Sequence, residues 1–272
     1  MPSWTVDAPK RFDFDDVTAL KVRLMAGSVA VLASDDPPSL VVTELKGRPL
    51  QVTQEGGELT ISYESLSWEG LLGFLKPRHD SVAVTITVPA DCPIQLGVLS
   101  ASAIVSGLRS GAAVKGMSGD VTLDGVAGNV EAETMSGEIA ARDIDGEVRF
   151  KSMSGGLVLA DGWLDRLEAN TMSGPIAADV TLRAEGDVHV STMSGDVTLR
   201  LPEGSDARVR LQSTSGAVRS EFESLRAVKA PASHTVSGNV GAGTGRVSVS
   251  TMSGSVTLLR RLRREGKESE TR

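Results

Sequence analysis

Side chains that could do chemistry are few in this sequence, and they are widely spaced. The three histidines, His79, His189 and His234, do not have the spacing of a metal site, and the single cysteine, Cys92, lies near only His79. A lone cysteine cannot form an internal disulfide, which favours a reducing compartment. We therefore predict neither a metal nor a cofactor, and we expect His189 to be a solvent-facing strand residue.

Nucleophilic and calcium-binding chemistry have no better support. Serines are abundant, but none is matched with a base, and the sequence holds no esterase nucleophile motif, P-loop or dinucleotide fingerprint. Glycine-led nonapeptides are typical of calcium-binding β-rolls, but here the equivalent positions carry mixed charge, at Asp124, Glu133, Arg142 and Lys151. We expect a protein that is not an enzyme, with a polysaccharide-active β-helix enzyme as the remote alternative.

The serines belong instead to a signature that recurs every 16 to 22 residues. A period in this range indicates a solenoid, in which each repeat buries its apolar face against its neighbours. Each serine is followed by glycine, and most are preceded by methionine; the copies are centred on Ser118, Ser136, Ser154, Ser173, Ser194, Ser215, Ser237 and Ser253.

Between these signatures the sequence alternates in short segments. Each nonamer begins with glycine and carries aliphatic or small residues at its third and fifth positions, as after Gly119 and Gly128. Such alternation predicts strands with one inward face, and a glycine every nine residues allows corners with positive φ. We predict an all-β fold, a parallel single-stranded β-helix with rungs of about 18 to 22 residues and a core running from Val121 to Val256.

The methionines of the signature form a ladder whose direction can be argued from strand parity. Parity carried from Val130 places Thr134 and Ser136 inside and Met135 outside, although an inward methionine stack is the alternative because one parity break must occur in the corner. A long exposed apolar stripe is an association hazard. We therefore expect the amino-terminal third to cover the ladder, which makes it an internal seam.

The chain is interpreted as one solenoid domain over residues 1–259. Residues 12–90 form an irregular β part that covers the open end of the solenoid, residues 97–259 carry the regular repeats, and residues 260–272 form a basic, disordered tail.

Two segments are candidate contacts with a partner or a membrane. One lies between the amino-terminal strands and has apolar residues at helical spacing, namely Trp68, Leu71, Leu72, Phe74 and Leu75. It is either an insertion packed onto the solenoid or an apolar peg that meets a membrane or a protein.

The second candidate is the basic start of the tail. Arg260, Arg261, Arg263 and Arg264 are either a solvated terminus or a contact with anionic lipid.

Composition limits the class of partner and the compartment. A net charge of −7, a pI near 5.1 and an aromatic content of 3% argue against nucleic-acid binding. The N-terminus lacks an apolar leader, and no apolar run approaches the length of a membrane span. We expect a cytoplasmic protein, peripheral to the membrane if the apolar peg or the tail binds lipid.

The repeated Thr-Met-Ser-Gly-Asp-Val-Thr-Leu run, after an amino-terminal β segment that ends in Val-Thr-Ile-Thr-Val-Pro89, resembles the bacterial toastrack domain, also called a putative-adhesin domain. The resemblance covers about residues 10–259. It implies a right-handed β-helix without an established catalytic site, whose relatives lie beside membrane segments in envelope-stress systems. We expect an interaction scaffold for an unidentified protein partner; the alternative is a carbohydrate-binding or surface adhesin.

Overall fold

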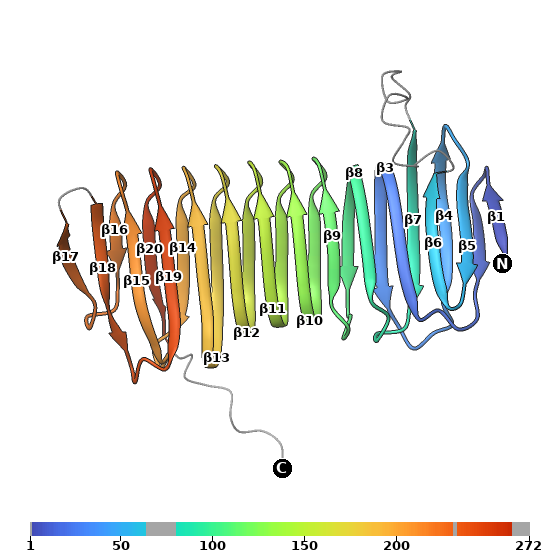
Figure 1. Ribbon diagram of the computed structural model, residues 1–272. Helices are drawn as coiled ribbons and strands as arrows, with labels where there is room; N and C mark the ends of the chain where they lie inside the picture. Colours follow the sequence, from blue (N-terminus) through green and yellow to red (C-terminus); the bar gives the residue numbers. More distant parts are fainter. Residues whose placement is uncertain (1, 64–79, 231–232, 263–272) are drawn as a thin grey trace, which may run out of the picture.

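The computed structural model describes residues 2–63, 80–230 and 233–262. These residues form a long β-solenoid in which rungs stack along one axis (Figure 1). The amino-terminal strands lie at one end, and β17 (Arg226–Ala230) and β18 (Ser233–Val240) lie at the other. Within the described ranges no helix is long and apolar enough to cross a membrane.

The middle of the solenoid is built from long strands that turn a corner and so contribute to two faces. The segments that follow each Ser-Gly turn, such as 121–124, form the first face, and those that precede it, such as 130–134, form the second face. All of these strands pair in parallel: β8 (Ile94–Ser106), β9 (Ala112–Gly116), β10 (Val121–Thr134), β11 (Ile139–Ser152), β12 (Leu157–Thr171) and β13 (Ile176–Thr192).

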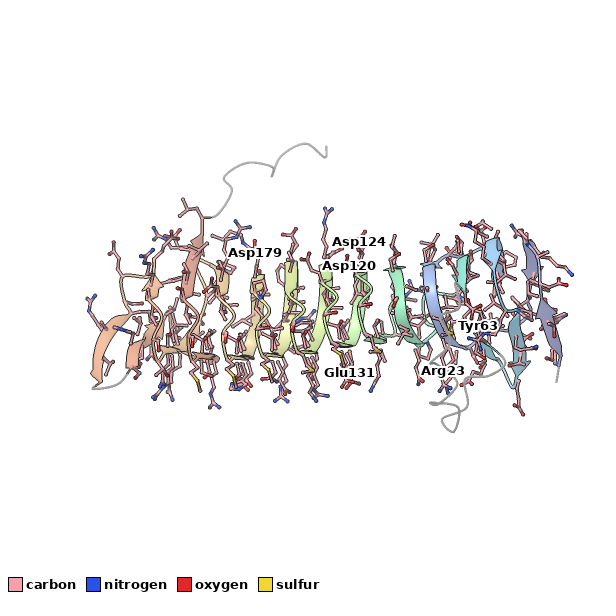
Figure 2. The ribbon with its side chains drawn as sticks, turned by 90° about the horizontal axis from the view of Figure 1, so that it is seen from above. Arg23, Tyr63, Asp120, Asp124, Glu131 and Asp179 are labelled. Atoms are coloured by element: carbon pink, nitrogen blue, oxygen red, sulfur yellow. The ribbon has the colours of Figure 1, made fainter. Side chains whose placement is uncertain are left out.

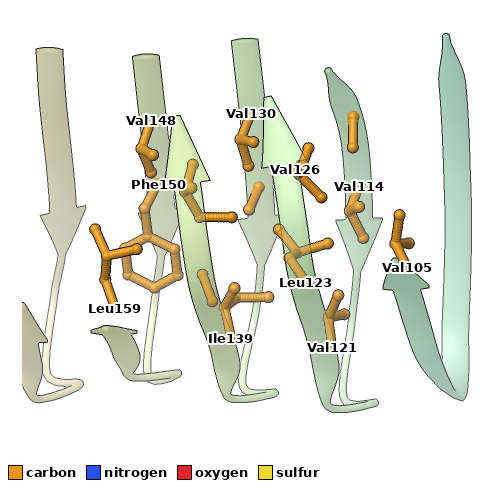
Figure 3. Packing of buried hydrophobic residues seen from close by; sticks show 14 of the residues in the cluster. Val105, Val114, Val121, Leu123, Val126, Val130, Ile139, Val148, Phe150 and Leu159 are labelled. Carbon is orange, nitrogen blue, oxygen red and sulfur yellow. The ribbon is translucent and has the colours of Figure 1, made fainter. Parts of the chain in front are cut away.

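The core lies between the two faces and contains the inward residues that the alternation predicted. Val148 is 3% exposed and Phe150 is fully buried, with Ile139 and Leu159 beside them in the stack (Figure 3). The corner opposite the Ser-Gly turn adds an inward position that we did not predict, occupied by Val126 in β10. Val218, near the far end, is only partly buried.

The Ser-Gly corner is shaped by the approach of one rung to the next. A Cβ on Gly137 would lie 2.1 Å from the carbonyl oxygen of Gly119, and one on Gly155 would lie 2.1 Å from that of Gly137. The amide of Gly137 donates to the inward hydroxyl of Thr134 at 3.0 Å, which satisfies a buried donor. Of the glycines that recur every nine residues, Gly128 (φ 92°) and Gly146 (φ 135°) have the expected positive φ, whereas Gly137 and Gly155 of the Ser-Gly corner do not.

Strand alternation predicted that Thr134 and Ser136 both point inward, which is correct for Thr134 and wrong for Ser136. Thr134 is buried as predicted, but Ser136 is exposed and its hydroxyl donates to the carbonyl oxygen of Met117 at 3.1 Å. The chain turns at Met135 and Ser136, so the alternation of the strand ends before the serine.

The amino-terminal part continues the solenoid and ends in antiparallel strands. β3 is a regular rung, paired in parallel with β8 on one side and with β6 and β7 on the other. Beyond it the pairing becomes antiparallel, and the rings of Trp4, Phe12 and Phe14 pack together near the end, with Trp4 and Phe14 centroids 5.6 Å apart. The strands of this part are β1 (Ser3–Val6), β2 (Lys10–Asp13), β3 (Ala19–Ala33), β4 (Ser39–Lys46), β5 (Leu50–Glu55), β6 (Glu58–Tyr63) and β7 (Ser81–Val88).

The carboxy-terminal part does not follow sequence order. β19 lies between β13 and β15, and β20 lies between β14 and β16, so the last rung of the chain is inserted before the preceding one. β17 and β18 pair antiparallel and close this end. The strands are β14 (Val197–Pro202), β15 (Ala207–Ser213), β16 (Val218–Ser220), β17 (Arg226–Ala230), β18 (Ser233–Val240), β19 (Gly245–Thr251) and β20 (Val256–Arg261).

This arrangement corrects two expectations. The signature around Ser237 is not a corner, because it lies inside β18, where Ser237 pairs with Arg210 of β15. The last strand also does not end at residue 259, since β20 continues through Arg260 and Arg261.

Candidate interaction surface

An uncharged row of outward side chains runs along the first face. Ile104 pairs with Thr122, and Val158 with Ala177, in an unbroken register. Ile104 is 49% and Val158 44% exposed. In spatial order this uncharged row consists of Val41, Thr85, Ala30, Ile104, Thr122, Ala140, Val158, Ala177, Thr198 and Thr257.

Charged and polar residues lie on both sides of this row. Toward the Ser-Gly corner, the Asp120 carboxylate accepts from the amide of Glu138 at 2.9 Å, an interaction between neighbouring rungs. Toward the opposite corner lie Asp124 and Arg142, which pair in register. Asp120 and Asp124 stand along one side of the ribbon in Figure 2. The first face therefore has an uncharged centre and a polar border.

The second face carries acidic and basic side chains that form ion pairs with one another. Lys115 Nζ lies 3.0 Å from a Glu133 oxygen, and Arg149 Nε lies 3.3 Å from a Glu168 oxygen. The hydrogen bond to Glu133 raises the pKa of Lys115. Glu131 stands beside Arg149 in the same register. Because these charges are paired across rungs, the second face is a polar, largely self-neutralised surface.

The methionines form an exposed stripe along the Ser-Gly corner. Their exposed fractions range from 44% for Met117 to 55% for Met252. The expected internal seam is therefore wrong: the described amino-terminal strands stack end to end with the repeats and leave the methionines exposed. Sulfur atoms follow one edge of the ribbon in Figure 2. In spatial order the methionine stripe is Met117, Met135, Met153, Met172, Met193 and Met252.

Most of the candidate contact residues predicted from sequence lie outside the part of the chain that the structure describes. The apolar segment with Trp68, Leu71, Leu72, Phe74 and Leu75 lies outside the described residues, as do Arg263 and Arg264.

Arg260 and Arg261 are the members of that set that can be placed. Arg260 Nη1 lies 3.0 Å from a Glu203 oxygen, and Arg261 Nη1 lies 2.6 Å from an Asp179 oxygen. Both guanidinium groups are therefore engaged with acidic side chains of the solenoid, and their contact with lipid stays a prediction.

The potential metal and nucleophile residues are separated. His189 in β13 and His234 in β18 are exposed, and His79 lies outside the described residues. Cys92 is 1% exposed, and burial raises the pKa of its thiol to about 11. Among the residues that the structure describes, no three histidine, cysteine or acidic side chains are grouped to hold a metal ion.

The uncharged row is a feature that we did not predict from the sequence, although its signal is present there. The residue after the first inward aliphatic of each repeat is Thr122, Ala140, Val158, Ala177 or Thr198 in successive copies. The absence of charge at that position is visible once the repeats are aligned by their glycines. What the sequence does not give is that the row continues onto the amino-terminal strands.

Comparison with known proteins identifies a family over most of the chain. The family described as Toastrack DUF4097 matches residues 17–259. No curated protein matches.

Solved structures with a similar arrangement include a putative lipid binding protein from Parabacteroides distasonis, 17% identical with TM-score 0.48 over 92% of this chain and 96% of that one. A putative adhesin from the same species is 12% identical, with TM-score 0.47 over 93% and 96%. A putative adhesin from Bacteroides fragilis is 10% identical, with TM-score 0.43 over 93% and 96%. At these identities and TM-scores the likeness carries no functional argument.

Proposed function

The chain belongs to the Toastrack DUF4097 family, and we propose that it acts without catalysis, as a scaffold that binds a protein partner along the uncharged row. The observation that carries this proposal is the continuity of the row, which passes from the amino-terminal strands across every regular rung to β20. A low-charge centre within a polar border is the anatomy of specific protein interfaces.

The chemistry of the row suits a large flat contact. Alanine, threonine and valine side chains have few rotamers to lose, so ordering them on binding costs little free energy. The exposed parts of Ile104 and Val158 supply apolar area, and removing such area from water contributes about 25 cal/mol per Å². A straight ladder of short side chains therefore favours a partner that is itself flat or extended.

Placing a charge in the row tests the proposal. Val158→Glu would put an unpaired carboxylate at the centre of the contact, where desolvation penalises it. Ser248→Glu is a matched control on the second face, where it would stand between His189 and Arg210. The tagged full chain and both variants would be used for quantitative pull-downs from the native host.

A partner retained by the wild type and by Ser248→Glu but lost with Val158→Glu would support the proposal. Equal retention by both variants would overturn it. The same pull-down with and without a membrane-perturbing stress addresses a finer proposal, that the scaffold serves envelope-stress signalling. A partner whose recovery does not depend on stress would contradict that finer part.

Carbohydrate binding is a second candidate because of one exposed aromatic residue. Trp163, at the corner opposite the Ser-Gly turn, is 57% exposed and stands in register between Asp145 and Thr181. An amphipathic ring beside polar groups suits a ligand with both apolar and hydroxyl surfaces. A glycan array that scores wild type and Trp163→Ala alike would remove this candidate.

Location is a further part of the proposal. We propose that the protein is cytoplasmic and reaches the membrane periphery through the apolar segment around Trp68 or through the basic tail. Anionic lipid contributes on the order of 1 kcal/mol for each basic residue near the surface. Fractionation of host cells at low and high salt tests this, because salt releases an electrostatic contact. Recovery of the protein from the cell exterior, instead of from the cytoplasm or the cytoplasmic membrane, would contradict the proposal.

A further inference from the structure

The methionine stripe presents thioether sulfurs at a fixed repeat. The main chain sets the register: the amide of Ser136 donates to the carbonyl oxygen of Met117 at 2.8 Å, and the last link joins Ser253 to Met193 at 2.9 Å. Equivalent bonds join every rung between them. Because paired strands lie about 4.8 Å apart, successive methionines project from the corner at that spacing.

Thioether sulfur is a soft, uncharged donor. Soft sulfur ligands select ions such as copper(I) over hard cations. A zinc–thiolate bond is about 2.3 Å long, and with metal–sulfur bonds of about that length a linear sulfur–metal–sulfur unit spans about 4.6 Å. This span is close to the distance between neighbouring rungs, and the flexible methionine side chain can absorb the difference.

Nothing else on the described surface competes for such an ion at this corner. The stripe is about half exposed along its length, so an ion can reach it from solvent. Three of the serine hydroxyls beside it donate to main-chain carbonyl oxygens, namely those of Ser118, Ser136 and Ser173. Cys92, the only cysteine of the chain, is buried away from solvent.

We propose that the methionine stripe binds soft monovalent metal ions, of the copper(I) and silver(I) class, each held between the sulfurs of two neighbouring rungs. Six sulfurs in one line accommodate three such ions. One of the pairs joins Met193 to Met252, which are neighbours only because β19 is inserted next to β13. This binding is independent of a contact at the uncharged row.

Two double variants with the same number of methionines test the pairing. Met117→Leu with Met135→Leu removes a neighbouring pair and leaves four consecutive sulfurs, which hold two ions. Met135→Leu with Met172→Leu leaves only Met193 and Met252 adjacent, which hold one ion. Leucine keeps the volume and apolar character of methionine, so the fold should be retained.

The measurement is the number of silver(I) ions bound per chain, by equilibrium dialysis in chloride-free buffer. All proteins carry Cys92→Ser, which removes the thiol, and circular dichroism verifies the fold. The histidines are the same in all three proteins, so the differences in ion number report the stripe. We expect the parent to bind one ion more than the neighbouring-pair variant and two more than the alternating variant. Equal numbers for the two double variants would show independent sulfurs and overturn the proposal, as would the absence of binding by the parent.

Discussion

Arg261 in the last strand reaches across β14 to Asp179 in β13. Its Nη1 donates to Asp179 Oδ1 at 2.6 Å, while Arg200 Nε of β14 donates to Oδ2 of the same carboxylate at 2.8 Å. The carboxylate is only 11% exposed. One acidic side chain therefore joins three strands at the point where the inserted rung enters the sheet.

Removing this charge should loosen the inserted rung. Asp179→Asn leaves Arg200 and Arg261 close together without a counter-charge, and hydrogen bonds to charged groups contribute about 1.5–3 kcal/mol. We expect the free energy of unfolding to fall by about 2 kcal/mol, measured by urea denaturation. The control is Asp145→Asn, whose partner Arg183 is well exposed and which should cost less than about 1 kcal/mol. Equal losses would show that Asp179 has no special role.

The Ser-Gly corner should not accept even a methyl group. In Gly137→Ala the new Cβ would lie 2.1 Å from the carbonyl oxygen of Gly119, so neighbouring rungs must separate. We expect a loss of several kcal/mol or failure to fold, as for overpacked cores or broken backbone contacts. Gly204→Ala is the matched control, since no atom lies within 4 Å of its Cβ position. Thermal unfolding of both variants decides whether close approach explains the glycine.

The core should respond far more strongly than the surface to loss of an aromatic ring. Phe150 is fully buried, so Phe150→Ala should cost about 3–5 kcal/mol through lost burial and an unfilled cavity. Trp163→Ala removes a larger ring that is 57% exposed and should change stability by less than about 1 kcal/mol. Denaturant unfolding compares them directly; a larger loss for Trp163 would contradict the assigned faces.

Much of the fold could be predicted because the sequence of each rung alone determines which of its side chains face the core. The alternation around Val148 and Phe150 places side chains inside or outside without knowledge of distant residues. The inserted rung could not be predicted in this way. The signatures around Ser215 and Ser253 are nearly the same, so neither repeat shows by its own pattern which of them pairs with β13. The order depends on contacts between distant residues, such as that of Arg261 with Asp179.

The uncharged row and the exposure of the methionine stripe were harder to predict, because they depend on contacts between distant parts of the chain. The expected burial of Met135 assumed that an apolar stripe must be covered by the amino-terminal third, but that third extends the solenoid axis and meets the rungs end to end. The uncharged row also depends on pairing across the junction, where Ala30 of β3 meets Ile104 of β8. Such long-range register is not encoded in any one repeat.

Stability should fall in alkali because two buried acids resist ionisation. Burial raises the pKa of Cys92 to about 11, and burial together with the nearby Asp80 carboxylate raises the pKa of Tyr63 to about 12. Between pH 9.0, the ordinary value of the thiol, and pH 11, the unfolded chain loses the Cys92 proton while the folded chain keeps it. The stabilisation of the folded state by the protonated Cys92 thiol is thus complete below pH 9.0 and is lost as the pH rises to 11.

The slope of stability against pH measures this effect. One such group changes the free energy of unfolding by at most about 1.4 kcal/mol per pH unit. Cys92→Ala should make the decline between pH 9.0 and pH 11 shallower while leaving the effect of Tyr63 at higher pH. Urea unfolding at several pH values provides the comparison, and the two proteins share all other titrating groups. Parallel curves would mean that the thiol ionises in the folded protein as it does in the unfolded chain.

The exposed methionine stripe should oxidise before the methionine that packs against the core. Peroxide converts an accessible thioether to the sulfoxide, and accessibility sets the order among methionines. Met135 is 46% exposed, whereas Met25 packs against the core and its sulfur contacts Arg48. Mild peroxide followed by peptide mass analysis should show rapid and similar oxidation along the stripe from Met117 to Met252, with Met25 lagging. If Met25 reacted first, or if the stripe reacted slowly throughout, the Ser-Gly corner would be covered in solution and could not serve as an open thioether surface.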